Sequence, residues 1–145
     1  MDTELKWKDL IQAALEGKTM AYTPYSKFQV GAALLGKNGD IFTGCNVENA
    51  AYSPTTCAER TAIVKAISHG VREFEAIAIV GSLIGNASDY CYPCGVCRQL
   101  LREFVPDDFP IIIAKTTTDY RVHTLGELLP HSFGASDLLK KEPII

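Results

Sequence analysis

The chain has 145 residues, of which 47% are hydrophobic and 21% are charged, proportions typical of a folded protein with a sizeable core. The formal net charge of −3 argues against a nucleic-acid partner, because such proteins usually present a basic face. No apolar run approaches the roughly 20 residues of a membrane span, and the N-terminus MDTELKWKDL lacks the apolar core of a secretory signal. We therefore expect a cytoplasmic protein with a single domain over residues 1–145.

The first half of the chain predicts a helix, a β-hairpin and a second helix. One apolar stripe with helical spacing lies near the N-terminus and comprises Trp7, Leu10, Ile11, Ala14 and Leu15. Two runs rich in β-formers, 28–35 and 41–45, flank the pair Asn38-Gly39, and an Asn-Gly pair between such runs predicts a hairpin. After a polar loop, apolar residues with helical spacing predict a helix over 58–69, which Gly70 ends.

The second half predicts alternating strands and helices. The continuous apolar run 76–80 is typical of a strand covered on both faces. A helix is expected after Pro93, a buried strand at 111–113, a weaker edge strand at 121–124 and a short helix at 125–129, before a polar tail. This order of elements predicts an α/β protein, a three-layer α/β/α domain with a mixed central sheet of about five strands.

Two short stretches carry the cysteines that suggest a metal site. They are Cys57-Ala58-Glu59-Arg60 and Pro93-Cys94-Gly95-Val96-Cys97, and each opens a predicted helix. Three of the five cysteines lie within seven residues, and in a reducing compartment such spacing favours metal over disulfides. Amides at a helix N-terminus stabilise thiolates. Three thiolates, from Cys57, Cys94 and Cys97, predict a catalytic zinc, because structural zinc usually takes four protein ligands.

Glu59 lies two residues after Cys57 and could carry the proton of a water activated by zinc. The spacing leaves alternatives open. Thr56-x-x-Glu59 also matches a capping box, in which the glutamate only caps the helix. Cys91 could join the other cysteines in a closed four-cysteine zinc site or an iron–sulfur site. Arg60 could offset the negative charge of the thiolates, or form a surface ion pair.

Both stretches together resemble the zinc signature of the cytidine deaminases, with Cys-Ala-Glu-Arg at 57–60 and Pro-Cys-Gly-x-Cys-Arg-Gln at 93–99. The resemblance extends through AYTPYSKFQVGAALL at 21–35, GCNVENAAYS at 44–53 and ELLPHSFG at 127–134, and so covers nearly the whole chain. Cysteine leads the first motif where polynucleotide and nucleotide deaminases generally have histidine. The chain is therefore most similar to the short, homotetrameric nucleoside deaminases.

The resemblance implies a cytidine-deaminase-like fold and one Zn²⁺ per subunit, held by Cys57, Cys94 and Cys97. It also implies that Glu59 moves the protons in the hydrolytic deamination of cytidine and 2′-deoxycytidine to uridine and 2′-deoxyuridine, with release of ammonia. This hydrolase reaction, on a C–N bond of a cyclic amidine, would serve pyrimidine salvage. A deaminase of a modified cytosine nucleoside such as blasticidin S is the alternative within the same chemistry. A non-catalytic four-cysteine zinc module is the alternative outside it.

The resemblance further assigns five residues to nucleoside binding: Phe28, Asn46, Glu48, Ala58 and Phe133. Asn46 and Glu48 would bond the ribose hydroxyls, Phe28 would pack beside the base, and the backbone of Ala58 would read its amide edge. Phe133 would stack on the base from a neighbouring subunit, so that a homotetramer completes the active sites. Positions associated with tuning or with this interface are Arg60, Tyr25 and Tyr52.

The stretch Tyr90-Cys91-Tyr92 departs from the family pattern, in which a small residue such as serine usually precedes the proline. Cys91 is thereby an extra thiol near the metal. It could replace the water on zinc or oxidise, but we expect it to be a bystander.

Overall fold

A mixed sheet of five strands, in the order β2-β1-β3-β4-β5, forms the centre of the computed structural model, which describes residues 3–139. The strands are β1 (Phe28–Gly36), β2 (Ile41–Cys45), β3 (Phe74–Leu83), β4 (Pro110–Ala114) and β5 (Tyr120–Thr124). The helices are α1 (Thr3–Lys18), α2 (Ala58–Ser68), α3 (Gly95–Phe104), α4 (Leu125–Leu128) and α5 (Ala135–Leu138). Among these five strands, β3 and β4 pair in parallel and the other neighbours pair antiparallel. The sheet confirms the predicted α/β class.

The hairpin between β1 and β2 forms where the Asn-Gly pair predicts it. Gly39 has φ of 94°, a left-handed conformation that glycine adopts without steric cost. The register places Leu34 opposite Phe42 and Gly31 opposite Cys45. Asn46, directly after β2, is thereby brought beside the start of β1.

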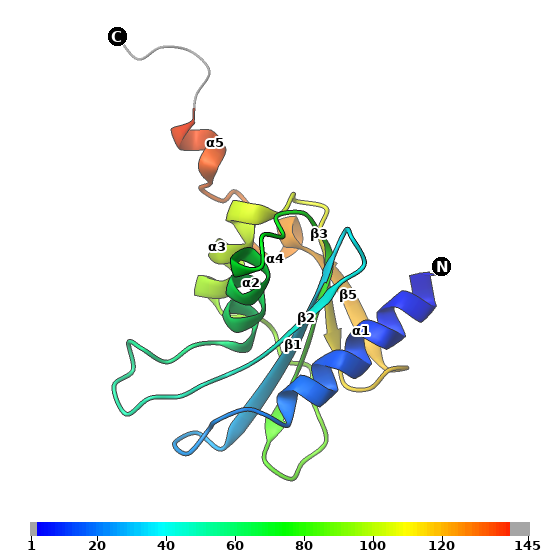
Figure 1. Ribbon diagram of the computed structural model, residues 1–145, viewed down its shortest axis with the longest axis vertical. Helices are drawn as coiled ribbons and strands as arrows, with labels where there is room; N and C mark the ends of the chain where they lie inside the picture. Colours follow the sequence, from blue (N-terminus) through cyan, green and yellow to red (C-terminus); the bar gives the residue numbers. More distant parts are fainter. Residues whose placement is uncertain (1–2, 140–145) are drawn as a thin grey trace.

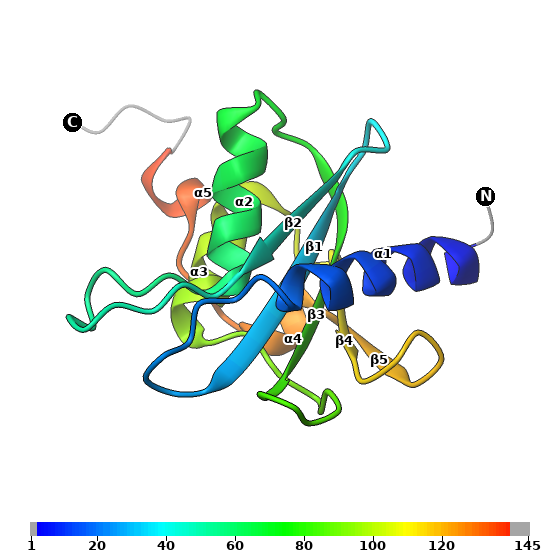
Figure 2. The same ribbon diagram turned by 60° about the horizontal axis from the view of Figure 1, so that its bottom comes forward.

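Side chains of β3 alternate between two apolar cores. Ala76, Ala78 and Val80 pack with the buried side of α1, whereas Ile77 and Ile79 pack with α2 and α3. One face of the sheet is therefore covered by α1 and the other by α2 and α3 (Figures 1 and 2). This burial on both faces confirms the interpretation of the run 76–80 as a covered strand.

Two glycines allow helices to lie directly against the sheet. A Cβ atom at Gly31 would lie 2.1 Å from the carbonyl oxygen of Ala14 in α1. A Cβ atom at Gly44 would lie 2.3 Å from the carbonyl oxygen of Ala58, at the first turn of α2. Since real Cβ contacts are never this short, only glycine fits at these positions. The contact at Gly44 fixes the start of α2 against β2.

Some details differ from the sequence predictions. β3 is longer than the run 76–80, because it continues in antiparallel pairing with the whole of β1. The short α5 was not predicted, and it projects beyond the layered body (Figure 1). The rest of the expected polar tail, 140–145, lies outside the described residues. Within residues 3–139, none of the helices is long and apolar enough to cross a membrane.

Candidate active site

The three cysteines predicted to bind zinc lie together at the starts of α2 and α3. The Sγ atom of Cys94 is 3.8 Å from that of Cys57 and 3.6 Å from that of Cys97, and all three lie within 4.8 Å of one another. Tetrahedral zinc with Zn–S bonds of about 2.3 Å separates its sulfur ligands by about 3.8 Å. The three sulfur atoms are therefore spaced to share one zinc ion.

Two of these thiols belong to residues at helix N-termini. Cys57 is the N-cap of α2 and Cys94 is the N-cap of α3, both with extended backbone angles and no side-chain capping bond. Their carbonyl groups accept the first helical hydrogen bonds, from the N–H groups of Thr61 and Arg98. Each thiol thus lies beside the positive end of a helix dipole, which favours a thiolate.

The thiols of Cys57 and Cys97 differ in the direction of their pKa shifts. The pKa of Cys57 is lowered to about 6, because the thiol of Cys97 donates to it, with further contributions from Cys94 and the positive charge of Arg60. The pKa of Cys97 is raised, because its proton is held in that hydrogen bond and the side chain is fully buried. Of these two thiols, that of Cys57 therefore ionises first.

Glu59 is the buried acid of the site, with only 4% of its surface exposed. Burial raises the pKa of its carboxyl group to about 7, and repulsion from the Cys57 thiolate acts in the same direction. The capping-box alternative is wrong for this helix. Cys57, not Thr56, is the N-cap, and the hydroxyl of Thr56 donates to the carbonyl group of Pro54. A carboxyl group close to half protonated at neutral pH can both accept and donate a proton.

A cavity of about 180 Å³ opens beside the thiols. Its lining consists of Val30, Asn46, Thr55, Thr56, Cys57, Ala58, Glu59, Cys91, Tyr92 and Cys94. A neighbouring cavity of about 300 Å³ shares Thr55 and is lined by Tyr25, Ser26, Glu48, Asn49, Tyr52 and Thr55. Residues of the loop between β2 and α2 line both hollows, and this loop projects from the body (Figures 1 and 2).

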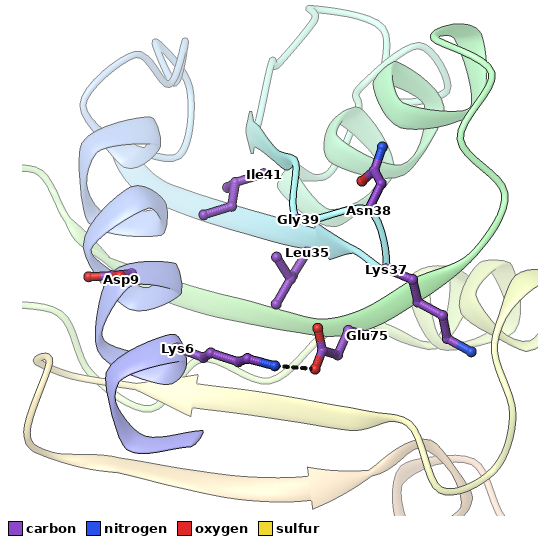
Figure 3. A pocket seen from close by; sticks show the side chains of 8 residues that line it. All are labelled: Lys6, Asp9, Leu35, Lys37, Asn38, Gly39, Ile41 and Glu75. Carbon is purple, nitrogen blue, oxygen red and sulfur yellow. Dashed lines mark hydrogen bonds and ion pairs between the residues drawn. The ribbon is translucent and has the colours of Figure 1, made fainter. Parts of the chain in front are cut away.

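A larger cavity of about 340 Å³ lies at the other end of β1, beside the hairpin turn (Figure 3). Its lining comprises Lys6, Asp9, Leu35, Lys37, Asn38, Gly39, Ile41 and Glu75. Lys6 and Glu75 form an ion pair of 2.8 Å across it. None of the cysteines lines this hollow. We therefore place the active site in the smaller cavity, which is lined by Cys57, Cys94 and Glu59.

Asn46 and Glu48 are both tied to the segment at the start of β1. The side chain of Asn46 accepts from the N–H of Val30 and donates to the carbonyl group of Phe28, each at 2.9 Å. The carboxylate of Glu48 accepts from the hydroxyl of Ser26, which lowers its pKa, and from the backbone N–H groups of Tyr25 and Ser26. Asn46 lines the cavity beside the thiols, whereas Glu48 lines the neighbouring one.

The remaining expected site residues fall into two groups. Ala58 is fully buried and lines the cavity beside the thiols, and Arg60 is half-buried in the first turn of α2. Tyr25 and Tyr52 line the neighbouring hollow, and Tyr52 is 91% exposed. Phe133 is 59% exposed and lines neither cavity of its own chain, although Gln99 donates to its carbonyl oxygen.

Cys91 lies near the three thiols spaced for zinc but does not belong to that group. Within residues 3–139, the group of side chains able to hold a metal comprises Cys57, Cys94 and Cys97 alone. Cys91 packs over Gly81, where an added Cβ atom would lie 2.8 Å from its Sγ atom. Burial raises the pKa of its thiol to about 11. Cys91 is thus a neutral thiol in the cavity wall.

Four of the lining residues were not predicted as metal-binding, catalytic or nucleoside-binding residues: Val30, Thr55, Thr56 and Tyr92. The two threonines directly precede Cys57, and Tyr92 directly precedes Pro93. Their nearness in the sequence to the metal ligands is the signal that could have identified them.

The family described as cytidine and deoxycytidylate deaminase zinc-binding region matches residues 5–113. A cytidine deaminase from Sporosarcina psychrophila is 47% identical over 129 residues, which are 89% of this chain and 92% of the relative. The crystal structure of a cytidine deaminase from Burkholderia pseudomallei is similar with a TM-score of 0.79 and 43% identity, covering 92% of this chain and all (100%) of that one. A more distant relative, a blasticidin-S deaminase from Bacillus cereus, is 34% identical over 120 residues, which are 77% of this chain and 85% of the relative.

Proposed function

The chain belongs to the cytidine and deoxycytidylate deaminase family, and from this membership we propose that its cavity binds a cytosine nucleoside and replaces the amino group by oxygen. Cytidine is the substrate, uridine and ammonia are the products, and deoxycytidine is a second substrate. The observation that carries the assignment is the presence of a buried acid, Glu59, in one cavity with a cluster of three thiols spaced for zinc.

Cys57, Cys94 and Cys97 hold the metal. A zinc ion bound there supplies the Lewis acidity that makes water a nucleophile at neutral pH. The chain assists by placing Cys57 and Cys94 at helix N-termini, where thiolates are stabilised. Three thiolates would leave excess negative charge, which the helix ends and Arg60 offset. This is a tuning role for Arg60.

Glu59 performs the proton transfers. Its carboxylate takes a proton from the attacking water and gives it to N3 of the cytosine ring as the oxygen adds at C4. Glu59 then takes the second proton from that oxygen and passes it to the exocyclic amine, which leaves as ammonia as the C4=O bond forms. One side chain can serve as both base and acid because its pKa of about 7 keeps both forms accessible.

The nucleoside is positioned by the start of β1 and the loop after β2. Each amide atom of Asn46 has capacity for one hydrogen bond beyond those to Phe28 and Val30, so Asn46 can still contact a ribose hydroxyl. Glu48 offers a carboxylate in the adjoining hollow, which would repel a phosphorylated sugar. Phe28 packs beside the base, and backbone groups of Ala58 read its amide edge.

A homotetramer completes the site in this proposal. Phe133 is exposed and lies two residues before α5, which projects from the body, so its side chain can reach the cavity of a neighbouring subunit (Figure 1). Tyr25 and Tyr52 are exposed aromatic residues beside the cavity and would be covered by such a neighbour. Large aromatic side chains of this kind are typical of buried interfaces.

The cellular role proposed is pyrimidine salvage in the cytoplasm. All five cysteines, which lie within residues 3–139, are free thiols, as a reducing compartment would keep them. Deamination of blasticidin S is the second candidate, favoured by the similarity to the Bacillus cereus enzyme. The four-cysteine module is disfavoured by the position of Cys91 over Gly81.

Turnover of cytidine by zinc-loaded protein tests the proposal, with Glu59→Ala beside it. The parent should release uridine and ammonia. The variant should retain zinc and lose turnover by about 10²–10⁴-fold, the usual contribution of a positioned proton carrier. A parent that holds zinc but deaminates cytidine, deoxycytidine and blasticidin S at no measurable rate contradicts the proposed function.

A further inference from the structure

Tyr92 connects the nucleoside cavity to the edge strand of the sheet. It lines the cavity together with Glu59 and Cys94. Its ring packs edge-on against the ring of His123 in β5, with centroids 5.4 Å apart and an interplanar angle of 63°. Its hydroxyl group lies 3.4 Å from both Nε2 of His123 and Nη1 of Arg121. A residue of the cavity wall is thus held from outside the cavity.

The hydrogen bonds of this contact are mutually consistent. The carboxylate of Glu127 lies 3.8 Å from Nδ1 of His123, and in the tautomer that carries its proton on Nδ1 the Nε2 atom is an acceptor. The hydroxyl of Tyr92 can then donate to His123 while its oxygen accepts from Arg121. Both partners of Tyr92 are held in turn, because Glu127 beside His123 also caps α4, and Arg121 has a second contact.

That second contact of Arg121 is with Tyr90, which precedes Tyr92 by two residues. The guanidinium group lies over the Tyr90 ring at 3.9 Å from its centroid, a cation–π distance. The hydroxyl of Tyr90 donates to Asp119 at 2.5 Å, just before β5. The segment leading to Cys94 is therefore attached to β5 through two tyrosines.

The strand register explains why β5 can support the cavity. Arg121 pairs with Ile113 and His123 with Ile111, and these isoleucines face the core formed with α2 and α3. Arg121 and His123 therefore share the face of the sheet on which the thiols lie. Val122, between them, points to the opposite face.

We propose that Tyr92, positioned by His123 and Arg121, is a specificity-determining wall of the nucleoside cavity. The inference rests on the proposed function. The ring limits the width of the cavity and thereby favours cytidine over larger cytosine nucleosides. It contributes to binding and takes no part in proton transfer, which belongs to Glu59.

Steady-state kinetics of Tyr92→Ser and Tyr92→Phe, on cytidine and blasticidin S, test the wall. Opening the cavity in Tyr92→Ser should raise KM for cytidine about tenfold and lower kcat less than about threefold, because an apolar contact acts on ground and transition states alike. The ratio of kcat/KM for blasticidin S to that for cytidine should rise. Tyr92→Phe keeps the ring and should restore KM to within about threefold of the parent. Zinc content should be unchanged in both.

The support from β5 is tested separately by the double variant Arg121→Ala/His123→Ala. It should raise KM for cytidine about threefold to fivefold while leaving the cavity lining itself intact. Val122→Ala, on the opposite face of the same strand, is the matched control and should retain the parent KM.

These measurements distinguish the role of Tyr92 from the deaminase activity itself. If the parent deaminates cytidine but Tyr92→Ser keeps the parent KM and the parent ratio of kcat/KM for the two nucleosides, the proposed role of Tyr92 is wrong. The proposed deaminase function is then unaffected. If Tyr92→Ser lowers kcat and leaves KM unchanged, the proposed role of Tyr92 in nucleoside binding is likewise wrong. If Tyr92→Ser does not fold, a parent-like KM in the β5 double variant overturns the positioning. A parent that deaminates neither nucleoside overturns the proposed function and this inference together.

Discussion

Asn46 and Phe28, two positions expected to contact the nucleoside, contact each other: Nδ2 of Asn46 donates a hydrogen bond to the carbonyl oxygen of Phe28 at 2.9 Å. Oδ1 of the same side chain accepts from the N–H of Val30. One amide therefore fixes the first residues of β1, of which Val30 lines the cavity. Binding and stability should consequently be coupled at Asn46.

Asn46→Ala should lower the free energy of unfolding by about 1–3 kcal/mol, because two half-buried backbone groups lose their side-chain partner. KM for cytidine should rise as well. Urea denaturation and steady-state kinetics measure the two effects. Asn49→Ala, in the exposed loop, should change stability by less than about 0.5 kcal/mol and is the control. A purely ribose-binding role would leave the stability of Asn46→Ala at the parent value.

Cys91→Ser should retain one zinc ion per chain, whereas Cys94→Ser should lose zinc and turnover. The reason is that the Sγ atom of Cys91 packs over Gly81, outside the group of three thiols. Atomic emission spectroscopy after exhaustive dialysis measures the metal. Loss of zinc from Cys91→Ser would instead identify a closed four-cysteine site.

Gly44→Ala should weaken both the fold and the metal site. Its Cβ atom would lie 2.3 Å from the carbonyl oxygen of Ala58, so the first turn of α2 must move away from β2. Cys57, at the N-cap, moves with it. We expect a loss of at least about 1–3 kcal/mol, the usual cost of overpacking, and a weaker zinc affinity in competition with a chelator. Val64→Ala, on the exposed side of α2, should retain parent affinity.

Acid stability should depend on Glu48. Hydrogen bonds from Ser26 and the neighbouring backbone lower the pKa of its carboxyl group in the folded state. The folded state therefore gains stability above the ordinary carboxyl pKa of about 4.3, and this gain is lost as pH falls through the lower folded value. Glu48→Gln should flatten the decline of stability below about pH 5. Thermal unfolding across pH, with Glu103→Gln as the matched carboxylate removal, measures the difference. Parallel curves for parent and Glu48→Gln would contradict the prediction.

Strong local signals predicted most of the fold. Asn38-Gly39 can hardly be other than a tight turn, and the run 76–80 is too apolar to face water on either side. The thiols of Cys57, Cys94 and Cys97 were grouped by their places at two predicted helix starts, and the structure brings them together. Few residue types can bind zinc, so a zinc site can be predicted from the positions of its cysteines in the sequence.

Contacts made across the fold were not predictable in the same way. The pattern Thr56-x-x-Glu59 is compatible with a capping box, whereas the structure forms one at Thr124 and Glu127. The two sequence patterns are the same, but α2 has Cys57 and not Thr56 as its N-cap, and its Glu59 is buried. The bonds from Asn46 to β1 depend on hairpin register, which composition does not specify.

The distance in sequence between the two metal-bearing helix starts has a consequence for the life of the protein. Cys57 and Cys94 are 37 positions apart, so an ion held by both encloses α2 and β3 in a closed loop. By chain-entropy arguments, such a cross-link is worth about 4 kcal/mol against the open chain. Loss of zinc would therefore remove the catalytic metal and the stabilising cross-link at the same time. Inactive copies would thereby become those most easily degraded, and a cell would not accumulate them.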